Sequence, residues 1–155
     1  MRSVFFKFRS HESNVTKTSS KIKNYRENYL YQIYKCVLSD FGIKALPEEL
    51  STHLDISSNI INDSSEKLDA IQDWLLKIKS KNNETEYFDV KIFNKIIGIY
   101  WLDFCTRSTS LGFNVFIKYL RSDLYSLDAI EIKSQIKFFI KCLIKYRASS
   151  KDRYI

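Results

Sequence analysis

The sequence has few of the residues on which most catalytic and metal-binding motifs depend. Its 155 residues include three glycines, one proline, three cysteines and two histidines. The glycines are isolated from one another, which excludes glycine-rich phosphate-binding loops and the Gly-x-Ser-x-Gly nucleophile turn. Neither histidine has a second ligand residue at a metal-binding spacing. From these absences we predict a protein that is not an enzyme and that carries no cofactor and no metal.

The three cysteines, Cys36, Cys105 and Cys142, are far apart in the sequence. An odd number without a close pair argues against a disulfide framework and against a zinc site. Each lies in an apolar stretch, so we expect all three to be buried as small hydrophobic side chains. Free cysteines suit a reducing compartment, and we therefore expect a cytoplasmic location.

Long apolar runs are absent as well. The longest, Ile96 to Leu102, has seven residues, whereas a membrane-spanning helix needs about 20. The apolar stretch near the start is short and is interrupted by Lys7, so no secretory signal is expected. Hydrophobic residues make up 45% of the chain and aromatic residues 15%. This content is sufficient for the core of one domain.

Apolar residues with helical spacing begin at residue 21. A helix is predicted over residues 21–41, with a buried face at every third or fourth position: Ile22, Tyr25, Tyr29, Ile33, Val37 and Phe41. Gly42 is expected to end it, because glycine adopts a left-handed conformation at low cost. A shorter helix is predicted to begin at Pro47, since proline suits the first helical position, and to end near Asp55.

The middle of the chain predicts two longer helices. Asp63 and Glu66 have the spacing of a capping box, and the helix that follows is expected to end near residues 81–83 and to bury Leu68, Ile71, Leu75 and Ile78. Residues 87–105 are apolar nearly all round, which is typical of a helix at the centre of a fold. Their aromatic and β-branched content is also compatible with strands.

Two further helices are predicted after a break at residues 106–110. The first carries Phe113, Phe116, Ile117 and Leu120. The second runs from Ser126 to about Arg147. Its apolar face is expected to be Ile132, Ile136, Phe139, Ile140 and Leu143, widened by Phe138, Ile144 and Tyr146. Six helices of unequal length with short connections predict an all-α, single-domain irregular bundle.

This single domain is expected to have three parts. Residues 1–20 would form an extended or loop-like basic arm, in which Val4–Phe8 is a short strand or an anchoring segment. Residues 21–147 would form the helical core, and residues 148–155 a basic tail. No internal repeat and no proline- or glycine-rich linker divides the chain.

Positive charge is concentrated at the two ends of a chain whose net charge is +7. Residues 1–26 and residues 133–155 each hold seven basic residues and one acid, whereas residues 27–132 hold eleven basic residues and sixteen acids. Basic ends of this kind can bind an acidic protein surface, nucleic acid or anionic lipid. They can also be solvated flanks without a binding role.

The last predicted helix contains a row of lysines. Lys133, Lys137, Lys141 and Lys145 recur every four residues, and each step rotates by about 40° around the helix, so they form one stripe. We predict that this stripe, extended by Arg147, binds a partner. Tyr31 and Tyr34 in the first helix are secondary candidates, because exposed tyrosines are frequent in interface hot spots.

These features favour a non-catalytic protein-binding module that docks on an acidic partner: an inhibitor, an immunity-type or antitoxin-like neutraliser, or an assembly adapter. The alternative is a nucleic-acid-binding or ribonucleoprotein component that uses the basic ends. A phosphodiesterase built on His11 and Glu12 is the third hypothesis, and it ranks last because no partner geometry supports it. The sequence leaves the oligomeric state open.

Overall fold

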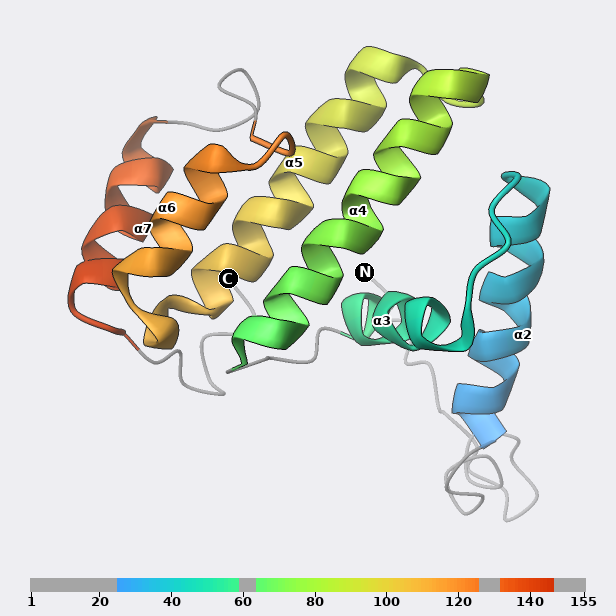
Figure 1. Ribbon diagram of the computed structural model, residues 1–155, viewed down its shortest axis with the longest axis horizontal. Helices are drawn as coiled ribbons and strands as arrows, with labels where there is room; N and C mark the ends of the chain where they lie inside the picture. The colour runs from blue at the N-terminus through green and yellow to red at the C-terminus, as the bar shows by residue number, and fades with distance from the viewer. Residues whose placement is uncertain (1–24, 59–63, 126–131, 147–155) are drawn as a thin grey trace, which may run out of the picture.

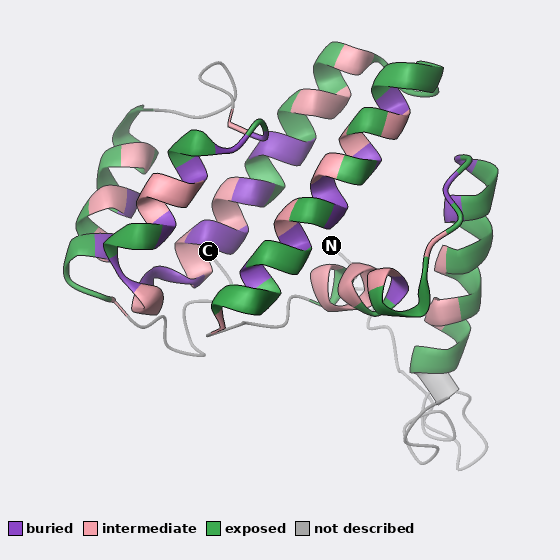
Figure 2. Cartoon of the chain, viewed as in Figure 1, coloured by how far each residue is buried: buried purple, intermediate pink, exposed green. Residues whose placement is uncertain are grey.

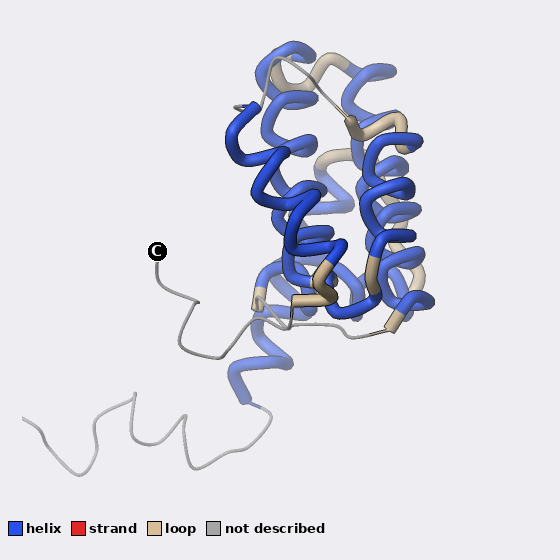
Figure 3. The backbone as a smooth tube through the Cα atoms, turned by 90° about the vertical axis from the view of Figure 1, so that its left-hand side faces the viewer, coloured by secondary structure: helices blue, strands red, loops and turns tan. Residues whose placement is uncertain are grey.

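The computed structural model describes residues 25–58, 64–125 and 132–146, which are helical and contain no strand (Figures 1 and 3). The elements are α2 (Tyr25–Asp40), α3 (Pro47–Ser57), α4 (Ser65–Thr85), α5 (Val90–Arg107), the 3₁₀ turn η1 (Thr109–Leu111), α6 (Phe113–Arg121) and α7 (Ile132–Leu143). The predicted all-α bundle is therefore confirmed. Residues 90–105 are helix, which resolves the choice between helix and strand.

The helices pack largely in the order in which they occur along the chain. Helix α2 packs on α3, α3 on α4, and α4 on α5, while α6, α7 and η1 complete the other side of the bundle. Figure 1 shows α4 and α5 in the centre, with α2 at one edge and α7 at the other. The two edges are therefore separated by the long central pair.

The predicted helix end at Gly42 and the predicted helix start at Pro47 are both confirmed. Gly42 has φ +85°, and Ile43 N–H donates to the carbonyl oxygen of Leu38 at 2.7 Å. This is the bond pattern of a Schellman helix end. Pro47 is the first residue of α3, and Leu46 N–H donates to Glu49 Oε2 at 2.8 Å. The helix thus begins with a paired backbone donor.

The start of α4 differs from the prediction by one residue. Ser64 is the N-cap, and its hydroxyl donates to the carboxylate of Glu66. The predicted partner, Asp63, lies outside the described residues. The predicted buried face of α4 is confirmed in full, and Trp74 and Asn82 are buried as well.

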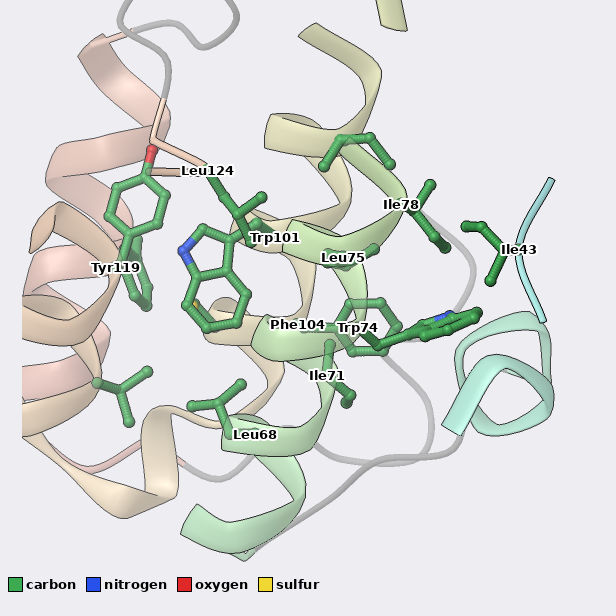
Figure 4. Close-up of a cluster of buried hydrophobic side chains, with 14 of the residues drawn as sticks. Ile43, Leu68, Ile71, Trp74, Leu75, Ile78, Trp101, Phe104, Tyr119 and Leu124 are labelled. Carbon is green, nitrogen blue, oxygen red and sulfur yellow. The ribbon is translucent and has the colours of Figure 1, made fainter. Parts of the chain in front are cut away.

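The core is built around two tryptophans that point in opposite directions. In Figure 4, Trp101 points from α5 towards Tyr119 of α6, and Trp74 points from α4 towards α3. Trp101 and Tyr119 have no exposed surface. Leu50 of α3 and Phe138 of α7 are buried at the two sides of this core. One apolar cluster therefore connects all six α-helices.

Of the predicted buried face of α2, Phe41 is confirmed as buried, and three of the positions before it are wrong. Tyr29, Ile33 and Val37 are exposed, and the helix instead packs through a second stripe that consists of Tyr31, Tyr34, Leu38 and Phe41. Both stripes have helical spacing, so periodicity alone cannot rank them. Contacts with α3 select the second stripe, as shown by the Tyr34 ring, which lies 4.7 Å from the His53 ring.

The predicted apolar face of α7 is confirmed for Phe138 and wrong for its aliphatic residues. Phe138 and Cys142 are the buried residues, while four of the five predicted core residues, Ile132, Ile136, Ile140 and Leu143, are exposed (Figure 2). The aromatic side chains decide the orientation, because the Phe138 and Phe139 rings both contact the Phe116 ring of α6. The aromatic side of α7 therefore faces α6, and edge-on and tilted ring contacts of this kind are favourable.

Two further expectations are corrected by the burial pattern. Helix α5 is not covered all round, because Ile92, Ile96, Ile99 and Tyr100 are between 45% and 60% exposed. Cys36 is exposed, whereas Cys105 and Cys142 are buried as predicted. Both differences have one cause: apolar residues are buried only on helix faces that have a neighbour, and the sequence alone does not identify those faces.

Candidate functional site

Helix α7 and the residue after it carry several exposed aliphatic side chains. We name this surface the aliphatic row: Ile132, Ile136, Ile140, Leu143 and Ile144. Its side chains are between 51% and 73% exposed. Such side chains of a helix normally pack against a neighbouring helix. Here the neighbouring helix α6 contacts Phe138 and Phe139 instead. The row is therefore apolar surface without a partner among the described residues.

Two of the predicted binding lysines lie beside the aliphatic row. Lys133 and Lys137 are exposed, and their spacing from Ile136 and Ile140 places them along one edge of the row. Lys141 is half-buried, and its ammonium group lies 4.9 Å from the centre of the Tyr146 ring. Within the described ranges, no acid forms an ion pair with any of these three lysines. The edge is thus positively charged.

The structure removes Lys145 from the predicted stripe. Helix α7 ends at Leu143, and Lys145 has φ +48°. Tyr146 N–H donates to the Lys141 carbonyl oxygen at 2.9 Å, and Lys145 N–H to the Cys142 carbonyl oxygen at 3.3 Å, which again form a Schellman end. The Lys145 stem lies against Gly112, where an added Cβ would come within 3.2 Å of Cε. Lys145 therefore packs against the turn before α6.

Arg147 lies outside the described residues. Tyr31 and Tyr34 are half-buried and pack on the core, so they are not the exposed tyrosines that the sequence suggested. They belong to α2, at the opposite edge of the bundle from α7 (Figure 1). The structure therefore brings Lys133, Lys137 and Lys141 together and leaves the tyrosines apart from them.

An apolar hollow of about 430 Å³ lies between α3, α4 and α5. Its wall includes His53, whose Nδ1 accepts a hydrogen bond from Trp74 Nε1 at 3.1 Å. Burial lowers the pKa of His53 below its usual range, so the imidazole is neutral and carries its proton on Nε2. This neutral ring has a structural role, because its basic nitrogen, Nδ1, already accepts the hydrogen bond from Trp74.

Glu49, one turn before His53 on α3, does not pair with it. Glu49 instead accepts two contacts from Lys77 Nζ of α4, at 2.6 and 2.8 Å. Burial alone would raise the pKa of Glu49, but the hydrogen bonds from Lys77 and from Leu46 N–H outweigh it, and the pKa is lowered. Among the described residues, no cluster of histidine, cysteine and acid could hold a metal ion.

No helix within the described ranges is long and apolar enough to cross a membrane. Comparison of the chain with protein-family models, with curated proteins and with solved structures finds no match. A functional interpretation therefore depends on the geometry of the chain itself. The aliphatic row and its lysine edge are a feature that no contact in the described fold explains.

Proposed function

We propose that this protein is a non-catalytic protein-binding module that docks its partner on α7. One observation carries the proposal: a row of exposed aliphatic side chains runs along α7, with Lys133 and Lys137 at its edge, and neither lysine forms an ion pair with a described residue. The partner that fits is a helix with its own aliphatic stripe bordered by carboxylates. An inhibitor, an immunity-type or antitoxin-like neutraliser and an assembly adapter would all use such a surface.

The aliphatic row supplies the affinity in this proposal. Fully burying one exposed isoleucine or leucine is worth about 1.5–3 kcal/mol, and these side chains are already partly covered. Several of them together can outweigh the cost of fixing a partner helix. The lysine edge supplies orientation and a faster, salt-dependent association with an acidic partner.

Charge argues against a second copy of this chain as the occupant. A symmetric pair of α7 helices would bring Lys133 and Lys137 of one copy towards the same residues of the other, and like charges at close range are unfavourable. Nucleic acid also fits less well, because phosphates would satisfy the lysines and leave the aliphatic row in water.

The test is capture of a partner by the immobilised full-length chain and by two charge-reversed variants. Lys133→Glu with Lys137→Glu should abolish capture from nuclease-treated native lysate at physiological salt. Lys91→Glu with Lys95→Glu changes the charge equally on exposed positions of α5 and should retain the partner. A third variant, Ile136→Asp, should also lose the partner, since it places a charge in the row.

Three outcomes would count against the proposal. Equal capture by all variants would show that α7 is only a solvated face. Loss of the bound material on nuclease treatment would favour the ribonucleoprotein alternative. Binding of purified chain to phosphatidylserine-containing vesicles, with loss of that binding in Ile136→Asp, would make α7 a lipid-binding helix. Circular dichroism of each variant checks that the helices remain formed.

A further inference from the structure

A second apolar surface without a partner among the described residues lies between the helix pair α2 and α3 and the central helices α4 and α5. The hollow beside His53 adjoins two others of about 360 and 330 Å³, and Phe93 lines all three. Together they form a continuous depression, which we name the Phe93 groove. It extends from Val37 at the end of α2, past His53 of α3, to Ile92 and Ile96 of α5.

Both walls of the Phe93 groove expose apolar side chains. Val37 is 56% exposed on the α2 side, and Ile92 and Ile96 are about half exposed or more on the α5 side. At the end where the walls meet, the Phe41 ring contacts the rings of Phe88 and Phe93. The groove is therefore a preformed, aromatic-floored site and not a row of separate surface residues.

The charge that lines the Phe93 groove is of one sign. Asp40 and Asp89 are its charged residues, and no lysine or arginine among the described residues lines it. The neutral His53 adds no positive charge. Asp89 Oδ1 also accepts a hydrogen bond from Ile92 N–H at 2.8 Å, which fixes this carboxylate at the groove edge. An occupant should therefore be apolar and basic.

The chain itself contains a segment of this chemistry. Residues 4–8 read Val-Phe-Phe-Lys-Phe, and Arg2, Lys7 and Arg9 accompany them without any acid in residues 1–10. We infer that Val4–Phe8 binds in the Phe93 groove of the same chain, with its phenylalanines on the apolar floor and its basic residues near Asp40 and Asp89.

The connection is long enough for this contact. Residues 9–24 separate the segment from α2, and sixteen residues span up to about 50 Å when extended. Helix α2 has 16 residues and is about 24 Å long, so the chain can return along it to the groove. Because the tether makes docking intramolecular, its effective concentration is of millimolar order. The segment then competes with any partner for the groove.

A cysteine in the wall of the groove reports whether the groove is occupied. The probe is Ile96→Cys in a Cys36→Ser background of the full-length chain, because Cys36 is the exposed native cysteine and Cys105 and Cys142 are buried. Replacing Phe5, Phe6 and Phe8 by serine should raise the reaction rate of this thiol with a disulfide reagent. We expect the rate to rise about tenfold, because a docked state that is favoured about ten to one over the open state leaves the thiol exposed for about a tenth of the time.

The matched control places the probe on α7. Ile136 is 54% exposed and Ile96 is 45% exposed, so Ile136→Cys should react at a rate that the three serine substitutions leave unchanged. Replacing both Asp40 and Asp89 by asparagine, or adding high salt, should raise the thiol reaction rate of the Ile96→Cys probe and leave that of the Ile136→Cys control unchanged. Val37→Cys on the other wall provides an independent probe if Ile96→Cys does not fold.

Two results would overturn the inference. In the first, both groove probes react as fast as the α7 control and do not respond to the serine substitutions. In the second, protection of the groove probes increases with protein concentration, which would assign the groove to another copy of the chain. Neither result depends on a partner of α7, so this test and the capture experiment can fail separately.

Discussion

Asn82 is a buried polar residue whose hydrogen bonds close the turn between α4 and α5. It has no exposed surface, its Oδ1 accepts from Phe88 N–H at 2.9 Å, and its Nδ2 donates to the Phe88 carbonyl oxygen at 3.1 Å. Asn82→Ala should lower the free energy of unfolding by about 2–3 kcal/mol, because two bonds are lost and both Phe88 groups lose their partner. Urea unfolding measures this change. Asn83→Ala, at the exposed neighbouring position, should have little effect.

His53 makes stability depend on pH. Its pKa is lowered by burial in the folded chain, so the unfolded chain binds a proton more readily, and acid favours unfolding. The contribution of His53 to stability is fully present above about pH 6.5, the ordinary pKa, and decreases as the pH falls below that value. Denaturation midpoints between neutral and mildly acidic pH should show this loss. His53→Gln should remove it, and an unchanged pH dependence in that variant would contradict the assignment.

At the scale of the helix, the end of α4 carries removable strain. Glu86 caps the helix in the left-handed conformation, with φ +51°, which costs a side-chain-bearing residue about 1–2 kcal/mol. Glu86→Gly should therefore stabilise the protein by about 1 kcal/mol despite the greater freedom that glycine gives the unfolded chain. Glu84→Gly, two residues earlier and inside the helix, should destabilise it by about the same amount. Thermal melting distinguishes the two signs.

Helix positions and the helix boundaries at Gly42 and Pro47 could be predicted from the sequence, because their causes are local, whereas the end of α7 at Leu143 could not. Gly42 and Pro47 act on the backbone within one turn, and the face of α4 is defined by a single apolar stripe. The faces of α2 and α7 could not be predicted, since each helix carries two apolar stripes and only contacts with a neighbour decide between them. In α7 the aromatic residues Phe138 and Phe139 outcompeted the aliphatic ones.

The candidate site was predicted only in part, for the same reason. The four-residue spacing of Lys133, Lys137 and Lys141 survives in the structure, because a continuous helix preserves it. Lys145 leaves the stripe where α7 ends. The aliphatic row was missed, since its residues had been assigned to the core. The signal that could have revealed it was the excess of apolar positions over those that one neighbouring helix can cover.

At the scale of the whole molecule, the three cysteines test the packing of α5 on α7. Cys105 and Cys142 have no exposed surface; burial raises the pKa of Cys105, and it raises that of Cys142 to about 11. A thiol that is both covered and protonated does not react. We expect one reactive thiol per native chain, at Cys36, and three in denaturant, as measured by titration with a disulfide reagent. Rapid modification of a second thiol in the native chain would contradict this arrangement.

The order of packing along the chain has a consequence for how quickly the fold can form. Helix α2 meets α3, α3 meets α4, α4 meets α5, and α6 meets α7, so most of the surface is buried between elements that are close in sequence. Short loops lose little entropy on closing, and helical proteins with a low contact order fold in microseconds to milliseconds. A chain with this topology can therefore complete its hydrophobic core within the time that a ribosome needs to add one residue.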